Sequence, residues 1–175
     1  MPTIVRQFEP GDAEDVAALF AAYMAEALGG VSVMTPERLV AGCGRQFELT
    51  LAADGRIVGF AAWRETYDLH HAAAGGEVID FFVAPAHRGR GVAVQLVAGV
   101  AAAVRARDGA FLYSLVLPDD PARLKLARRW GVGFPGEHVY LAQEVFARMA
   151  DWGGRAPVRP AIRALLELRR KDEAD

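Results

Sequence analysis

The chain has few of the features that mark secreted or membrane proteins. Its 175 residues include one cysteine, Cys43, so no disulfide can form within the chain. No run reaches the roughly 18 apolar residues that a membrane-spanning helix requires. The first residues also lack the basic segment, followed by an apolar one, of a secretory signal. These absences predict a soluble cytoplasmic protein with no membrane partner.

Neither sign of charge dominates, and no metal-ligand pattern is present. The chain has 20 Lys and Arg against 22 Asp and Glu, which gives no long-range attraction to nucleic acid, so no nucleic-acid partner is expected. The adjacent His70 and His71 point in different directions and lack further ligands at suitable spacing, so no metal is predicted. The alternative for this pair is to line an acceptor cleft.

Known nucleotide-binding loops are also absent. The run Arg88-Gly89-Arg90-Gly91 is the most distinctive glycine-rich segment, and we call it the glycine turn. No Gly-Lys-Ser/Thr follows it, so it is not a Walker loop, and it lacks the third glycine and the early position of a dinucleotide fingerprint. Nucleoside triphosphate and nicotinamide cofactors are therefore disfavoured.

Hydrophobic periodicity predicts an α/β protein. Strands are expected at residues 3–8, 46–51, 56–65, 77–83 and 111–117, with one or two more within 134–146, and a loop at 68–76. Helices are expected at residues 12–29, 36–41, 92–108, 120–131 and 160–171. This order predicts a mixed sheet with helices on both faces. We expect one domain over residues 1–152, then a linker and an amphipathic helix over 153–175 that packs on the domain or on a partner subunit of a homodimer.

The glycine turn has the properties of an anion site. Glycines allow close approach of the backbone, and the N–H groups at the start of the following helix lack intrahelical acceptors. The helix dipole adds about half a positive charge at that end. A phosphate or pyrophosphate is therefore the expected ligand.

At this turn the chain resembles the GNAT superfamily of N-acetyltransferases. Arg88, Gly91 and Ala93 match the motif Gln/Arg-x-x-Gly-x-Gly/Ala, and the preceding residues 81–85 match its lead-in. The resemblance implies a mostly antiparallel central sheet of six to seven strands and acetyl-CoA as co-substrate. It implies a pyrophosphate on the amides of the turn and pantetheine along the preceding strand. The implied cofactor-binding residues are Phe81, Phe82, Val83, Arg88, Gly89, Arg90, Gly91, Val92, Ala93 and Asp120.

Attack of an amine on a thioester needs a base, an oxyanion donor and an acid. Glu77 falls on the strand position where the histone-acetylating branch of the superfamily carries its base, and a backbone N–H near Phe81 is the expected oxyanion donor. Asp80 is the rival base, although strand alternation places it on the opposite face. The alternative for both acids is a solvated strand end.

The sequence departs from the family pattern at the general acid, the residue that protonates the leaving thiolate. Ala127 stands where many members carry a tyrosine that protonates the thiolate, although Asp120 occupies the place of the asparagine that opens that helix. Tyr113 or Tyr140 could substitute, or bulk water could protonate the thiolate.

The sequence thus predicts an acetyl-CoA-dependent N-acetyltransferase that acts on a primary amine of a small molecule or peptide by direct transfer. Tyr23 and Glu26 of the first helix lie where acceptors commonly bind in the superfamily, with a solvated helix face as the alternative. A catalytically inactive CoA-binding regulatory or interaction module is the second hypothesis, motivated by Ala127. A phosphate-binding α/β domain unrelated to CoA is the third.

Overall fold

The structure is a computed structural model that describes residues 3–115, 131–133, 138–141 and 143–153. Its strands are β1 (Ile4–Gln7), β2 (Glu48–Ala53), β3 (Ile57–Asp68), β4 (Ala73–Val83), β5 (Phe111–Leu115), β6 (Gly131–Gly133) and β7 (His138–Leu141). Its helices are α1 (Ala13–Leu28), α2 (Pro36–Gly42), α3 (Val92–Arg105) and α5 (Gln143–Trp152), with short 3-10 turns at Pro10–Asp12 and Pro85–His87.

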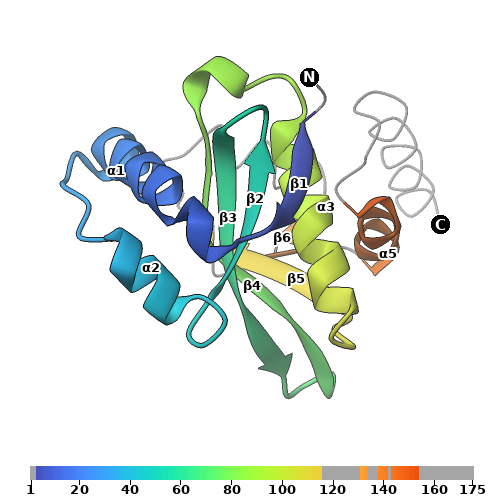
Figure 1. Cartoon of the computed structure of the whole chain (residues 1–175). Helices are drawn as coiled ribbons and strands as arrows, with labels where there is room; N and C mark the ends of the chain where they lie inside the picture. The colour runs from blue at the N-terminus through green and yellow to red at the C-terminus, as the bar shows by residue number, and fades with distance from the viewer. Residues whose placement is uncertain (1–2, 116–130, 134–137, 142, 154–175) are drawn as a thin grey trace.

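The strands form one mixed sheet with helices on both faces. Their order is β1-β2-β3-β4-β5-β7-β6, and β4 with β5 is the parallel pair among otherwise antiparallel neighbours. Helices α1 and α2 cover one face, and α3 and α5 cover the other (Figure 1). The predicted mostly antiparallel sheet of six to seven strands is confirmed.

Each face of the sheet has its own apolar core. Val16, Phe20 and Tyr23 of α1 are buried at the helical spacing that the sequence shows, against Phe60 of β3. On the other face α3 buries an apolar stripe against Trp63 and α5. We call these two layers the α1 core and the α3 core.

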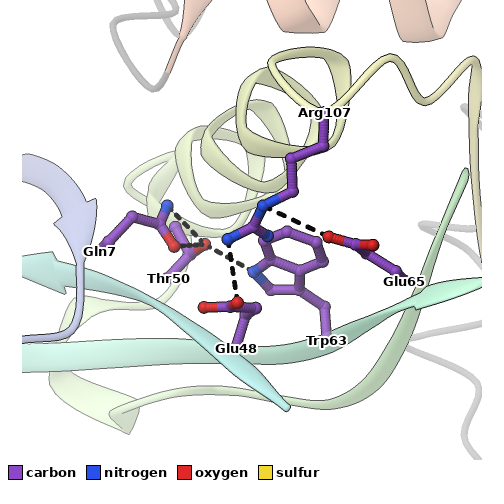
Figure 2. Close-up of polar contacts among 6 residues, drawn as sticks. All are labelled: Gln7, Glu48, Thr50, Trp63, Glu65 and Arg107. Carbon is purple, nitrogen blue, oxygen red and sulfur yellow. Dashed lines mark hydrogen bonds and ion pairs between the residues drawn. The ribbon is translucent and has the colours of Figure 1, made fainter. Parts of the chain in front are cut away.

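A polar network sits beneath the α3 core. Thr50, fully buried on β2, accepts hydrogen bonds from Trp63 Nε1 and from Gln7 Nε2, each at 3.1 Å (Figure 2). The Arg107 guanidinium lies 4.9 Å from the Trp63 ring centroid and pairs with Glu48 at 2.9 Å. The network therefore ties three strands to the end of α3.

Replacing Thr50 with valine should destabilise the fold. The change keeps the shape but leaves the buried Trp63 N–H without its acceptor, which costs about 1–3 kcal/mol. Denaturant unfolding measures this loss, and Thr50→Ser, which keeps the hydroxyl, is the matched control. Equal stability of the valine variant and the wild type would contradict a structural role for this hydrogen bond.

The hairpin of β3 and β4 is longer than predicted. Residues 73–76, expected in a loop, belong to strand β4. Their alanines and glycines lack the alternation of apolar and polar side chains that indicates a strand, because close packing requires small residues here. A Cβ at Gly75 would lie 2.6 Å from the Phe111 ring, and one at Gly76 would lie 2.6 Å from Val104. Because Gly75 and Gly76 have no side chains, β4 can lie in close contact with Phe111 and Val104.

The end of the domain is helical where strands were predicted. Residues 143–146, assigned to a final strand, open α5, whose buried Val145, Phe146, Met149 and Ala150 follow helical spacing against α3. The predicted helices at 120–131 and 160–171 and the linker before the second lie outside the described residues, except for Gly131 and Gly153. No helix in the described part of the chain is long and apolar enough to span a membrane.

Candidate active site

The described pairing of β4 with β5 ends near the middle of β4. Its register with β5 runs from Gly75 with Phe111 to Val78 with Ser114. Beyond Val78 the described part of β4 is in register with β3 alone. At that point the β3 register passes from Val78 directly to Asp80, so Ile79 forms a bulge and is 46% exposed. We call this end of the described β4–β5 pairing the opening.

The glycine turn follows the end of β4 and leads into α3. Gly89 and Gly91 have φ of +73° and +84°, in the left-handed region that residues with a side chain rarely adopt. Gly91 is the N-cap of α3, and no side chain among the described residues caps that helix. The first intrahelical bond runs from Gln95 N to Gly91 O at 3.1 Å, so the amides of residues 92–94 precede it and have no intrahelical acceptor. The turn thus offers amides and a helix dipole to an anion.

Arg88 contacts both β4 and α1, although its side chain is 45% exposed. Its Nε donates to Val83 O at 2.8 Å, and its Nη2 lies 2.7 Å from a Glu26 carboxylate oxygen. Its guanidinium also lies 5.3 Å from the centroid of the Phe82 ring. Arg88 therefore ties the turn to β4 and α1, and both Arg88 and Arg90 are exposed. Glu26, considered as a site for an acceptor amine, already has a cationic partner.

One row of residues crosses the strands beside the opening. Arg64 on β3, Glu77 on β4 and Tyr113 on β5 are neighbours in register, and the backbone of Tyr140 on β7 continues the row. Arg64 Nε donates to Glu77 Oε2 at 2.6 Å. The Tyr113 phenol is close enough to Thr66 and Glu77 for both to affect its pKa. The row brings two of the predicted catalytic residues together.

Burial raises the pKa of the Tyr113 phenol above its ordinary value, and the negative charge of Glu77 acts in the same direction. The phenol therefore stays protonated at neutral pH and through the mildly alkaline range. A protonated hydroxyl beside a carboxylate has the properties of a proton donor.

Asp80 lies on the same face of the sheet as Glu77, which contradicts the expectation of opposite faces. Val78 packs on the α3 core, so Glu77 faces the α1 side, and Asp80 reaches that same side, where it accepts a hydrogen bond from Tyr23 at 2.7 Å. The bulge at Ile79 adds one residue and shifts the strand alternation. Both carboxylates consequently face α1. Tyr23 is buried, so it does not belong to a solvated helix face.

The remaining predicted residues divide into three groups. Phe82 and Val83 are buried at the end of β4, and Phe81 is half-buried beside them, as expected for core side chains. His70 and His71 lie in the exposed turn between β3 and β4, where His71 pairs with Asp68, and no three potential metal ligands converge in the described residues. Asp120 and Ala127 lie outside those residues.

Arg64 and Thr66 were not identified as candidates from the sequence. They alternate with the buried Trp63 along a strand that sequence analysis did predict. Their spacing therefore placed both on one face, but only the register with Glu77 and Tyr113 shows what they contact.

A mixed sheet with a glycine turn between a strand and the start of a helix is the arrangement that the GNAT resemblance implies. The chain belongs to the acetyltransferase (GNAT) family, whose model matches residues 17–132, more than half of the sequence. The predicted family is thereby confirmed.

Solved structures share this fold. A ribosomal-protein-alanine N-acetyltransferase from Brucella melitensis biovar Abortus is 25% identical with a TM-score of 0.65, over 76% of this chain and 93% of that one. An integron cassette protein from V. cholerae is 16% identical with a TM-score of 0.65, over 78% and 89% of the two chains. An aminoglycoside acetyltransferase from an uncultured soil sample, in complex with sisomicin, is 15% identical with a TM-score of 0.62, over 76% and 94%. No curated protein matches the sequence.

Proposed function

We propose that the protein transfers the acetyl group of acetyl-CoA directly to a primary amine of a small molecule or peptide. The observation that carries the proposal is the start of α3 behind the glycine turn, which has no side-chain cap among the described residues and follows the part of β4 that lies beyond the described β5 register. This arrangement would suit a cofactor with a diphosphate, bound at the amides of the turn, and an extended arm, paired along β4 at the opening.

The residues present fit this co-substrate. The amides from Gly89 to Ala93 would hold the diphosphate, because two left-handed glycines leave the backbone accessible. The backbone of β4 at Phe81, Phe82 and Val83 would pair with the amide-bearing arm, with Asp120 assigned by family resemblance. Acetyl-CoA supplies the activated acetyl group when it is bound.

Glu77 is the proposed general base and Tyr113 the proposed general acid. A carboxylate takes the proton of the acceptor ammonium, directly or through a water, and Glu77 is 19% exposed beside the opening. Tyr113, held protonated by burial, gives a proton to the departing sulfur. Asp80 remains the rival base, because it faces the same side, although it already accepts the Tyr23 hydroxyl.

The direct test is release of free CoA from acetyl-CoA in the presence of a panel of primary amines, with mass spectrometry of the products. Acetylation of any amine at a rate above the buffer background is the expected result. Tight CoA binding without turnover across the panel would contradict an enzyme and favour the inactive CoA-binding module.

Replacing Tyr113 with phenylalanine should lower kcat by about 10²-fold or more, the scale for loss of a general acid, while the Kd for acetyl-CoA stays unchanged. Because its pKa is raised, loss of the phenol proton should cause no fall in wild-type kcat below about pH 10. Steady-state kinetics from pH 7 to 9.5 measure both. An unchanged kcat would move the acid role to Tyr140 or to solvent.

A further inference from the structure

Arg64 beside Glu77 places a positive and a negative group together at the opening. We propose that the acceptor is a zwitterion, an amine with a carboxylate on the neighbouring carbon, as in a free α-amino acid. This inference rests on the proposed function, because it names the acceptor class of the same site.

Arg64 has donors left for a ligand. It uses Nε for Glu77 Oε2, and its two Nη groups have no acceptor among the described residues. Its side chain is 57% exposed, so the Nη groups are accessible from solvent. Paired guanidinium donors fit a carboxylate in a bidentate contact. A substrate carboxylate is therefore the group that Arg64 is arranged to bind.

Glu77 provides the negative charge that would bind the ammonium group of the zwitterion. Its carboxylate lies mostly enclosed between Arg64 and Tyr113, on the face of the sheet that α1 covers. An ammonium contacting Glu77 would have the Arg64 cation beside it, and a substrate without a carboxylate would leave that repulsion uncompensated. A zwitterion compensates both charges, because its own opposite charges are one carbon apart.

A polycationic acceptor fits this face less well. Such a molecule needs several carboxylates without cationic or hydrogen-bonding partners. The described carboxylates near the opening already have partners: Glu26 with Arg88, Glu77 with Arg64, and Asp80 with the Tyr23 hydroxyl. Their summed charge therefore attracts a polyamine weakly.

The test compares amino acids with their carboxamides, which keep the amine and lose the negative charge. Glycine, L-leucine and L-phenylalanine and the three matching amides are titrated calorimetrically into the full chain saturated with CoA, and then assayed for acetyl transfer from acetyl-CoA. Spermidine and kanamycin are tested in parallel as polycationic acceptors. We expect each acid to bind at least about tenfold more tightly than its amide, since it alone pairs with the guanidinium.

Variants of Arg64 assign the preference to this residue. Arg64→Gln should remove it by raising KM for the acids with a smaller change in kcat, and Arg64→Lys should restore part of it, because the charge returns without the planar pair of donors. Arg56→Gln is the matched control, since Arg56 is an exposed arginine in the turn before β3. It should leave both KM and the preference unchanged.

The outcomes separate the two proposals. Acetyl transfer at equal efficiency to acids and amides, better transfer to spermidine or kanamycin, or a preference that survives Arg64→Gln would each overturn the zwitterion inference and leave the N-acetyltransferase standing. Preferential binding of the acids without any transfer would overturn the enzyme and leave the zwitterion site standing. Failure of every acid to bind the CoA-saturated chain would overturn the inference.

Discussion

Replacing Gly91 with glutamate is expected to lower acetyl-CoA affinity by more than about 10²-fold. Gly91 has a φ of +84°, and a side chain in this region costs on the order of 1–3 kcal/mol of strain. The new carboxylate would also stand at the start of α3, where we place the diphosphate, so that two negative charges would compete for the same amides. Isothermal titration calorimetry measures the loss.

Gly55→Glu is the matched control for this change. Gly55 has a φ of +74° in the turn between β2 and β3, and no atom of the described residues would lie within 4 Å of a Cβ at this position. This variant introduces the same charge and a similar backbone strain outside the proposed site. We expect its acetyl-CoA affinity to match the wild type. Unchanged affinity in Gly91→Glu itself would remove the argument for a phosphate site at the glycine turn.

Glu77→Gln is expected to reduce kcat by about 10² or more, the usual scale for loss of a general base. The amide keeps the shape and an acceptor for Arg64, which is half-exposed, so the fold and the Kd for acetyl-CoA should change little. Steady-state kinetics with the best acceptor, together with calorimetry, separate the two effects.

Two further variants make this result specific. Glu65→Gln removes a more exposed carboxylate on the adjacent strand, where it pairs with Arg107, and should leave kcat unchanged. Asp80→Asn tests the rival base on the same face. A normal rate in Glu77→Gln combined with a large loss in Asp80→Asn would assign the base to Asp80.

The glycine turn and the order of most elements were predictable because their signals are local. Residues 88–91 combine glycines with the start of an apolar helical stripe, and the structure has α3 there. The apolar period of α1 likewise lies within one segment. Such patterns depend on neighbours three or four residues away, so a single sequence contains them.

The geometry around the candidate site depends on contacts between distant segments. The bulge at Ile79 arises from pairing with β3, and it reverses the predicted face of Asp80. Gly75 suggests a loop by composition, yet it belongs to a strand because the Phe111 ring occupies the space of a side chain. Arg64 acquires its partner only through the register of β3 with β4. Residue spacing alone contains none of these relations.

The strand predicted at residues 143–146, where α5 begins, was wrong for a different reason. Val145, Phe146, Met149 and Ala150 have helical spacing, but an aromatic and β-branched segment just before them favoured a strand. The boundary between β7 and α5 falls within a few residues, and such short transitions are the least certain part of a periodicity argument.

The most direct test of the proposed cofactor is calorimetric titration of acetyl-CoA into the purified wild-type chain, with ATP and NAD as controls. It requires no knowledge of the acceptor. The glycine turn and the opening beside β4 predict selective binding with a Kd on the order of micromolar for acetyl-CoA and much weaker binding of both controls. Absence of binding, or equal binding of all three ligands, would contradict an acetyl-CoA site in this protein.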